Sequence, residues 1–166
     1  MSRPKLIPDS DVQNAILYLL DCEGEKAVSF SRVARTTGLA PATLVQRFGS
    51  LDGMLKAALN SGWDAADATL TAACTASLDQ KGALQLLKSL PKVNSLLAAS
   101  QRDEALRQRA AHWRGAVEAA LTMRLGSKSK QGQKAALLFA LWQGQLIWQN
   151  SGGKSLKLKE VLKQLL

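Results

Sequence analysis

Hydrophobic residues recur at helical spacing from the start of the chain. In residues 9–22 they return at i, i+3, i+4, i+7 and i+8, which places them on one face of a helix. These positions are Val12, Ala15, Ile16, Leu19 and Leu20. Asp9, Ser10 and Asp11 offer N-cap chemistry and suit the positive end of the helix dipole. Because Gly24 is a stop signal, we expect an amphipathic helix over 9–22.

Two short helical patterns follow this first helix. Ser29 can cap a helix that ends before Gly38, with its apolar positions at Phe30, Val33 and Ala34. Its basic positions, Arg32 and Arg35, point elsewhere.

A third helix is predicted to begin at Pro41, a residue favoured at the first helical position. Leu44, Val45 and Phe48 are the candidates for its inward face. Gly49 and Ser50 end this helix. Ser50 and Asp52 then start a fourth helix that reaches residue 60 or beyond.

The third helix is only about eight residues long, which makes it marginal in isolation. A tight connection, Thr37-Gly38-Leu39-Ala40, joins it to the second helix. Three helices with this connection form a helix-turn-helix plan. Its short last helix is held crosswise by its neighbours and can enter a major groove about 12 Å wide.

The rest of the chain shows helical spacing, few turn signals and no period-2 strand pattern. Further helices are expected at 63–78, 82–90, 92–99, 103–125, 131–149 and 156–166. The breaks between them fall at Gly82, Pro91, Gly126 and Gly152-Gly153. The predicted fold class is therefore all-α.

Charge is distributed unevenly along the chain. The formal net charge is +9, from 22 Lys and Arg against 13 Asp and Glu. Residues 1–55 are balanced, with six basic and six acidic residues. We interpret the basic excess after them as a solvated surface, the alternative being a preference for an anionic effector. Within the balanced part, residues 26–49 hold four basic residues and no acid: Lys26, Arg32, Arg35 and Arg47. This basic strip overlaps the two short helices and favours an anionic partner.

Several classes of protein are excluded or disfavoured by the composition. The longest strongly apolar run, residues 135–142, is far shorter than the ~20 residues of a membrane span. Two cysteines, Cys22 and Cys74, and the single imidazole of His112 are too few for a structural zinc site. Both cysteines are expected as buried thiols rather than as a disulfide.

Chemistry and targeting features are also missing from the sequence. Residues 1–11 lack the apolar region of a signal peptide, so a cytoplasmic location is expected. No paired carboxylates on one helix face, glycine-rich phosphate loop, metal cluster or catalytic triad is apparent. We therefore expect a protein that is not an enzyme and needs no metal or cofactor.

Residues 29–59 carry a set of motifs in a fixed order. They are Val33-Ala34 in the first short helix, Thr37-Gly38-Leu39 at the turn, Thr43-Leu44 in the next helix, and Phe48-Gly49-Ser50 before the fourth. In this respect the segment resembles the DNA-binding region of the TetR family of transcriptional regulators, and the likeness extends over residues 9–62. Beyond it, the resemblance consists of the helical plan and the segment Trp142-Gln143-Gly144.

The resemblance implies a division of the chain into two domains. Residues 1–50 correspond to the helix-turn-helix DNA-binding domain. Residues 51–166 correspond to a helical domain that binds an effector and dimerises, with 51–62 as the connecting helix.

Three positions depart from the family pattern. The family usually has Ser where this chain has Ala40, an aromatic residue where it has Val45, and Lys where it has Leu51. Each missing group is a typical phosphate contact, and such contacts set register and much of the affinity. The substitutes that this chain offers are Arg32, Arg35, Gln46 and Arg47.

The predicted DNA contacts lie on the two short helices. Gln can bond adenine, Arg can bond guanine or a phosphate, and Thr can touch a thymine methyl group. Free N–H groups after Pro41 suit a phosphate, and the small side chain of Ala42 permits close approach. The full candidate set is Ser29, Arg32, Arg35, Pro41, Ala42, Thr43, Gln46 and Arg47. Arg3 and Lys5 are either a basic arm along the duplex or an unstructured tail.

The last two predicted helices are candidates for a homodimer interface. The helix 131–149 is apolar nearly all round and should be buried on more than one side. The last helix carries its leucines on one face, which suits an interface with a second copy. The alternative interpretation is a helix that lies on a membrane surface. The family resemblance implies dimerisation through both, and the candidate residues are Leu141, Gly144, Gln145, Trp148, Leu158, Leu162 and Leu165.

Four residues could line an effector pocket in the second domain. They are His112, Trp113, Met123 and Trp142. Aromatic side chains with one polar group are typical of such pockets, although ordinary core packing explains them equally well.

The leading hypothesis is a dimeric repressor that reads a palindromic operator in double-stranded DNA and responds to a small-molecule effector. The alternative is an all-helical interaction protein that has a helix-turn-helix shape and does not read DNA sequence. The sequence leaves open the operator, the effector, the regulated genes and the direction of regulation.

Overall fold

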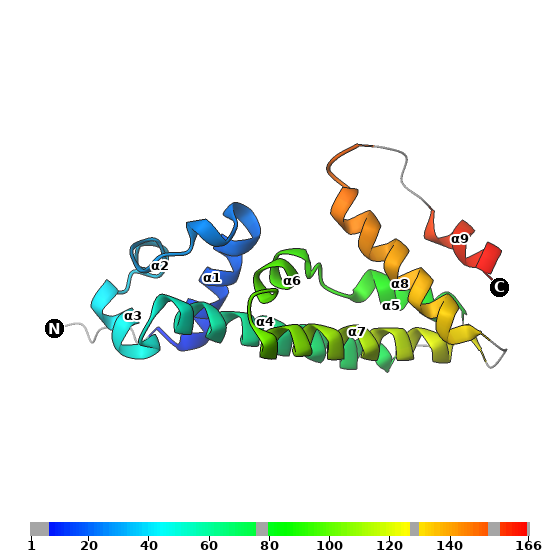
Figure 1. The fold of residues 1–166 in the computed structure, drawn as a ribbon, viewed down its shortest axis with the longest axis horizontal. Helices are drawn as coiled ribbons and strands as arrows, with labels where there is room; N and C mark the ends of the chain where they lie inside the picture. Colours follow the sequence, from blue (N-terminus) through cyan, green and yellow to red (C-terminus); the bar gives the residue numbers. More distant parts are fainter. Residues whose placement is uncertain (1–6, 76–79, 127–129, 153–156, 166) are drawn as a thin grey trace. The chain divides into compact units, whose positions relative to one another are not determined.

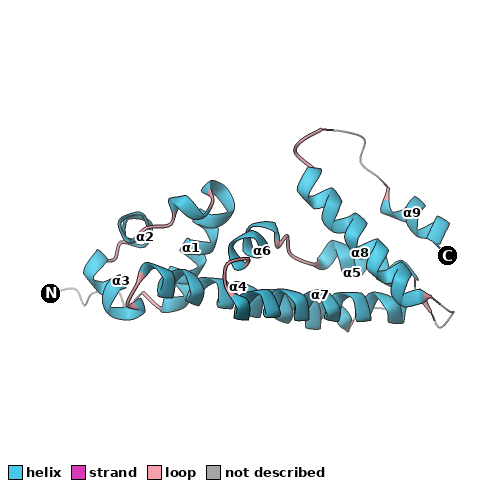
Figure 2. Cartoon of the chain, in the orientation of Figure 1, coloured by secondary structure: helices cyan, strands magenta, loops and turns pink. Residues whose placement is uncertain are grey.

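The computed structural model describes residues 7–75, 80–126, 130–152 and 157–165. The side chains at 80, 81, 164 and 165 lie outside this described part, as do Arg3 and Lys5. The described residues form helices and connecting loops, with no strand among them (Figures 1 and 2). The predicted all-α class is confirmed.

The helices follow the predicted order closely. They are α1 (Asp9–Glu23), the 3-10 helix η1 (Glu25–Ala27), α2 (Phe30–Thr37), α3 (Pro41–Phe48), α4 (Leu51–Cys74), α5 (Gln80–Ser89), α6 (Asn94–Ser100), α7 (Glu104–Leu125), α8 (Gln131–Trp148) and α9 (Leu158–Leu165). The chain divides into two compact units, one within residues 1–65 and 95–107 and the other within 66–94 and 108–166.

The core of the first unit is built from the inward faces of α1 to α4. Its buried residues are Val12, Ile16, Leu19, Val28, Val33, Ala34, Leu44, Met54 and Ala58. The fully buried Leu44 is the one residue of α3 in this set, and its burial contributes about 2 kcal/mol to the stability of the unit. A helix too short to form alone is thus held by contacts with its neighbours.

Helix boundaries in this unit follow from capping. The Ser29 hydroxyl accepts a hydrogen bond from the Arg32 N–H at 3.2 Å, as predicted, and Gly38 ends α2 in the left-handed conformation at φ 75°. The cap expected at the start of α1 is wrong. Pro8 occupies that position, and its carbonyl accepts from the main-chain N–H of Asp11. Asp9 and Asp11 lie inside the first turn, where their charge interacts favourably with the helix dipole without capping the helix.

Helix α4 joins two segments that the sequence predicts separately, the fourth helix reaching residue 60 or beyond and the helix over 63–78. Gly62 lies inside it, and a Cβ atom there would come within 2.9 Å of the Leu96 side chain and 3.2 Å of the Leu17 side chain. Gly62 therefore permits α1 and α6 to approach α4 closely. Glycine normally disfavours a helix interior, but the close packing at this position leaves no room for a side chain.

Polar contacts also tie α6 and the first turn of α7 into the first unit. The Trp63 indole N–H donates to the buried Ser100 hydroxyl at 3.0 Å. Lys56 of α4 lies 3.1 Å from Asp52 and 3.0 Å from Asp103. The Asp103 carboxylate accepts from the Leu106 main-chain N–H at 3.0 Å and so caps α7.

These contacts shift the pKa of two groups. The Leu106 N–H, with the Lys56 ammonium second, lowers the pKa of the Asp103 carboxyl. Asp103, together with Asp52, raises the pKa of Lys56. The two shifts have the signs expected when hydrogen bonds and an ion pair favour the charged forms.

The second unit has its own apolar interior. Trp113, Val117 and Leu121 of α7 are buried, as the helical spacing predicts. Buried residues of α8 are Gln131, Ala135, Leu138, Phe139 and Trp142. Helix α9 packs against α8 and buries Leu162.

Arg124 is a buried cation that the sequence does not reveal as structural. Its guanidinium donates to the Ala120 carbonyl at 2.9 Å and to the Ala73 and Cys74 carbonyls at 3.4 Å. The last two carbonyls belong to the C-terminal end of α4, where a cation interacts favourably with the helix dipole.

Two further expectations, on the burial of the cysteines and on the break at Gly82, need correction. Cys22 and Cys74 are free thiols, as expected, but Cys22 is exposed and Cys74 half-buried, so neither is the buried thiol that was predicted. Gly82 does not separate two helices, because α5 begins two residues earlier and includes it.

Candidate nucleic-acid interface

The recognition helix of the predicted motif is α3, which the fold holds by one side. Pro41 is its first residue, and the Ala40 carbonyl accepts from the Thr43 and Leu44 N–H groups. Leu44 is fully buried, whereas Pro41, Ala42 and Gln46 are exposed. Thr43 is half-buried. An exposed side therefore runs along the helix opposite the buried leucine.

Val45 belongs to this exposed side, which corrects its predicted inward position. Its side chain is 45% exposed. Each residue of an α-helix turns about 100° from the one before, so Val45 points well away from Leu44 and lies close to Gln46. An apolar side chain here is suited to contact a thymine methyl group. The sequence did carry a signal for this exposed position, because the family pattern usually has an aromatic phosphate contact where this chain has Val45.

The other two departures from the family pattern also lie at the surface. Ala40 is exposed at the turn before α3, and Leu51 is exposed at the start of α4. Neither side chain can donate a hydrogen bond to a phosphate. The surface around α3 is consequently poorer in phosphate donors than the family pattern.

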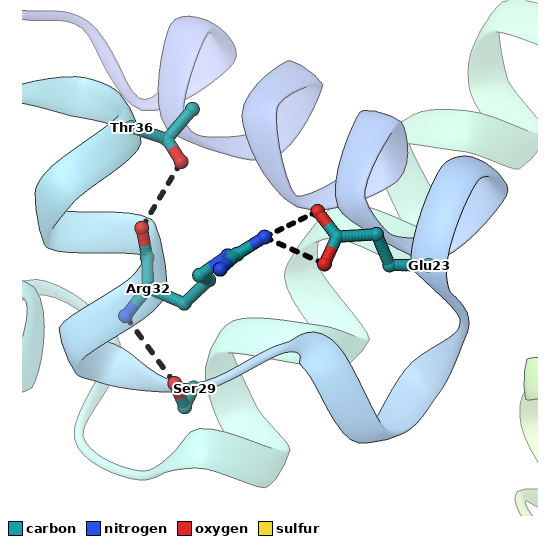
Figure 3. Close-up of polar contacts among 4 residues, drawn as sticks. All are labelled: Glu23, Ser29, Arg32 and Thr36. Atoms are coloured by element: carbon teal, nitrogen blue, oxygen red, sulfur yellow. Dashed lines mark hydrogen bonds and ion pairs between the residues drawn. The ribbon is translucent and has the colours of Figure 1, made fainter.

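Helix α2 supplies two arginines of the basic strip. Arg35 is exposed in its last turn. Arg32, in its first turn, donates through one guanidinium nitrogen to both carboxylate oxygens of Glu23, at 2.5 and 2.6 Å (Figure 3). Ser29 caps this helix and also lies 3.2 Å from the Ser31 hydroxyl, oxygen to oxygen.

Arg47 is bound by the start of α1. Its guanidinium donates to the Ile7 main-chain carbonyl at 2.7 Å and to the Asp9 carboxylate at 3.2 Å. The side chain is 22% exposed. Two of the four cations of the basic strip are thus paired with acids from α1. Sequence reasoning missed Glu23 and Asp9 as partners because both lie outside the strip.

The effector-pocket candidates separate into two groups. Trp113 and Trp142 are buried, and Phe139 lies between them, with ring centroids 6.2 Å from Trp113 and 5.8 Å from Trp142. His112 and Met123 are exposed. The structure brings together only the two tryptophans, around a phenylalanine that was not singled out.

Five of the seven dimer candidates are exposed or half-buried in the second unit. Trp148 is 66% exposed, and its neighbour Ile147 is exposed as well. Four candidates are half-buried: Leu141, Gly144, Gln145 and Leu158. Leu162 is buried within the chain, and the side chain of Leu165 lies outside the described residues. Helix α8 is thus buried on one side only in the single chain.

The described part of the chain has neither a metal-binding cluster nor a membrane-spanning helix. No group of three or more His, Cys, Asp or Glu side chains there could hold a metal ion. No described helix combines the length and hydrophobicity needed to cross a membrane.

Comparison with known proteins gives matches by structure only. No protein-family model and no curated protein matches the chain by sequence. A proposed transcriptional regulator from Saccharomonospora viridis, solved in complex with choline, matches with a TM-score of 0.74 at 16% identity, covering 95% of this chain and 92% of the other. The multidrug binding protein EbrR, complexed with imidazole, matches with a TM-score of 0.63 at 22% identity, covering 98% of this chain and 96% of the other.

A regulator of the TetR/AcrR family from Thermobifida fusca YX-ER1 matches with a TM-score of 0.60 at 17% identity, covering 95% of this chain and 93% of the other. The chain has the TetR-family fold. The fold predicted from residues 29–59 is therefore confirmed, and the likeness extends over nearly the whole chain. Within this fold, α2 and α3 are the two short helices for which the sequence predicts a helix-turn-helix.

Proposed function

We propose that the protein is a DNA-binding transcriptional regulator whose residues 1–50 read double-stranded DNA. The observation that supports this most strongly is the geometry of α3, a short helix held by Leu44 that exposes Ala42, Val45 and Gln46. A recognition helix needs this combination, because one side must be anchored while the other enters the major groove. The structural neighbours that are transcriptional regulators support the same assignment.

In this proposal each candidate has a defined role. Gln46 bonds a base edge, while Val45 and Thr43 contact thymine methyl groups. The N–H groups at the start of α3 and the Ser29 hydroxyl bind phosphates, as do Arg32 and Arg35. Arg47 holds the start of α1 against α3 and reaches DNA from that position.

We further propose that the protein acts as a homodimer through α8 and α9. One eight-residue helix contacts too few bases for selectivity, whereas two copies can read a two-fold-symmetric site. The exposed Ile147 and Trp148 at the end of α8 support this assignment, since large apolar side chains on a surface often mark an interface.

Residues 51–166 would then carry the effector site. Two structural neighbours are complexed with small molecules, one with choline and one with imidazole. In this chain the aromatic group around Phe139 is the candidate region. An effector that favours a conformation with low DNA affinity would cause repression to be relieved.

The alternative, an interaction protein that does not read DNA, is favoured by two observations. The positions of three usual phosphate contacts hold Ala40, Val45 and Leu51, all exposed. In addition, Arg32 and Arg47 are paired with acids of α1.

Selection of bound duplexes from a random DNA pool distinguishes the two functions. The regulator should recover a palindrome, and binding to it should weaken steeply as salt rises. Weak association without sequence preference would contradict the proposal and support the alternative. Adding choline or imidazole to the recovered complex then tests whether either compound weakens it.

A further inference from the structure

The main chain of Arg32 makes hydrogen bonds with two side chains of the same segment. The Arg32 main-chain N–H donates to the Ser29 hydroxyl at 3.2 Å, and the Arg32 main-chain carbonyl accepts from the Thr36 hydroxyl at 3.0 Å (Figure 3). The guanidinium projects from this fixed point to Glu23, the last residue of α1. Arg32 is therefore a cation at a defined position on α2 that already has an anionic partner.

The partner is of the same chemical kind as a DNA phosphate. Both present charged oxygen atoms in a geometry that a guanidinium recognises. The two side chains are 39% and 41% exposed, so a phosphate can approach the guanidinium from solvent. An ion pair this exposed contributes little to stability, and a second anion can therefore compete for the cation.

We propose that Glu23 limits the DNA affinity of this protein by competing with a backbone phosphate for Arg32. This inference rests on the proposed function, because it assumes that α2 lies against DNA. In the free protein Arg32 is bound to Glu23, and in the complex it turns to a phosphate while Glu23 becomes solvated. Because the Arg32–Glu23 ion pair must be broken, DNA binding is weakened by the free energy that this pair contributes to the free protein.

Arg47 does not allow the same exchange. It donates to a main-chain carbonyl, that of Ile7, as well as to Asp9, and it is less exposed than Arg32. Turning Arg47 toward DNA would leave that carbonyl without its donor. Of these two arginines, Arg32 is therefore the one that can exchange its acidic partner for a phosphate.

The test compares the full-length wild-type protein with Glu23→Gln, Arg32→Ala and the double variant. Binding is measured by fluorescence anisotropy on two duplexes, one recovered by the wild-type selection and one of scrambled sequence and equal length. We expect Glu23→Gln to bind both duplexes about two- to fivefold more tightly per protomer, because a freed phosphate contact carries no sequence preference. In the Arg32→Ala background the same change should give a much smaller gain.

Two further variants separate the ion pair from general charge and from folding. Asp11→Asn removes an exposed carboxylate from the first turn of the same helix and should give a smaller gain than Glu23→Gln. Glu23→Asp keeps the charge but shortens the side chain by one methylene group, so its affinity should lie between wild type and Glu23→Gln. Circular dichroism melting shows that each variant is folded.

The outcomes distinguish the two levels of the proposal. If the wild-type protein selects no duplex, the proposed function fails and this inference fails with it. If the wild type binds a selected duplex but Glu23→Gln binds it equally or less tightly, only the inference is wrong. An equal gain in the presence and absence of Arg32 also overturns it, because the effect would then be general charge.

Discussion

Gln46 and Arg47 are adjacent on α3 and differ in how the fold uses them. Gln46 is exposed, whereas the Arg47 guanidinium donates to the Ile7 carbonyl and the Asp9 carboxylate. A side chain with such partners affects the stability of the protein as well as its binding. The two substitutions should therefore have different consequences.

Replacing each residue by Ala tests this difference. Gln46→Ala should relax preference at one base pair of the selected site, at a cost of about 1–3 kcal/mol, with thermal stability unchanged. Arg47→Ala should lower stability by about 1 kcal/mol and also weaken DNA binding, since charge-assisted hydrogen bonds are lost. Melting curves and anisotropy titrations measure both. If binding to the selected site is unchanged in Arg47→Ala, Arg47 contributes nothing to recognition.

Gly38 is the residue on which the turn between α2 and α3 depends. Its φ of 75° lies in the left-handed region, where a side chain is strained. Gly38→Ala should reduce the free energy of unfolding by about 1 kcal/mol or more, measured by urea denaturation. Gly115→Ala is the matched control, because Gly115 lies inside α7 with open space around its Cβ position. That control should stabilise the protein slightly, by up to about 1 kcal/mol.

At the scale of elements, the connection from α6 to α7 is fixed to α4 through charge. Asp103 caps α7 and pairs with Lys56, and the pKa of its carboxyl is lowered in the folded state. A lowered pKa contributes stability above the unfolded value of about 4, and this contribution is lost as the pH falls through the folded value. The raised pKa of Lys56 works in the opposite range, because its contribution is lost only at strongly alkaline pH.

Asp103→Asn should therefore flatten the acid limb of the stability profile. We expect lower stability than wild type at neutral pH and a shallower fall in the unfolding free energy below about pH 4. Urea denaturation at a series of pH values measures it. Parallel profiles for the two proteins would show that Asp103 is not the group responsible.

At the scale of the whole molecule, the proposed dimer requires that α8 be covered by a second copy. Trp148→Glu should then produce monomers and reduce affinity for a palindromic duplex, because a charge cannot be buried unpaired in an apolar interface. Sedimentation velocity measures the oligomeric state. Met123→Glu is the control, since Met123 is also 66% exposed but lies on α7. Two variants with the same sedimentation behaviour would place the interface elsewhere.

Local patterns in the sequence were sufficient for most of the helical plan. The spacing of Val12, Ile16 and Leu19 gave α1, while Ser29, Gly38 and Pro41 gave the ends of α2 and α3. Such features depend on interactions within a few residues, which is why they can be derived without a structure. The motifs of residues 29–59 added the family fold.

Only the tertiary structure decided which cations of the basic strip have acidic partners. Arg32 and Glu23 are nine residues apart, and Arg47 and Asp9 are 38 apart. Likewise, Gly62 remains helical because Leu96, far along the chain, packs against it, and Val45 is exposed because the core accepts Leu44 instead. Contacts between distant residues depend on how helices pack, and a pattern of neighbouring residues does not contain that information.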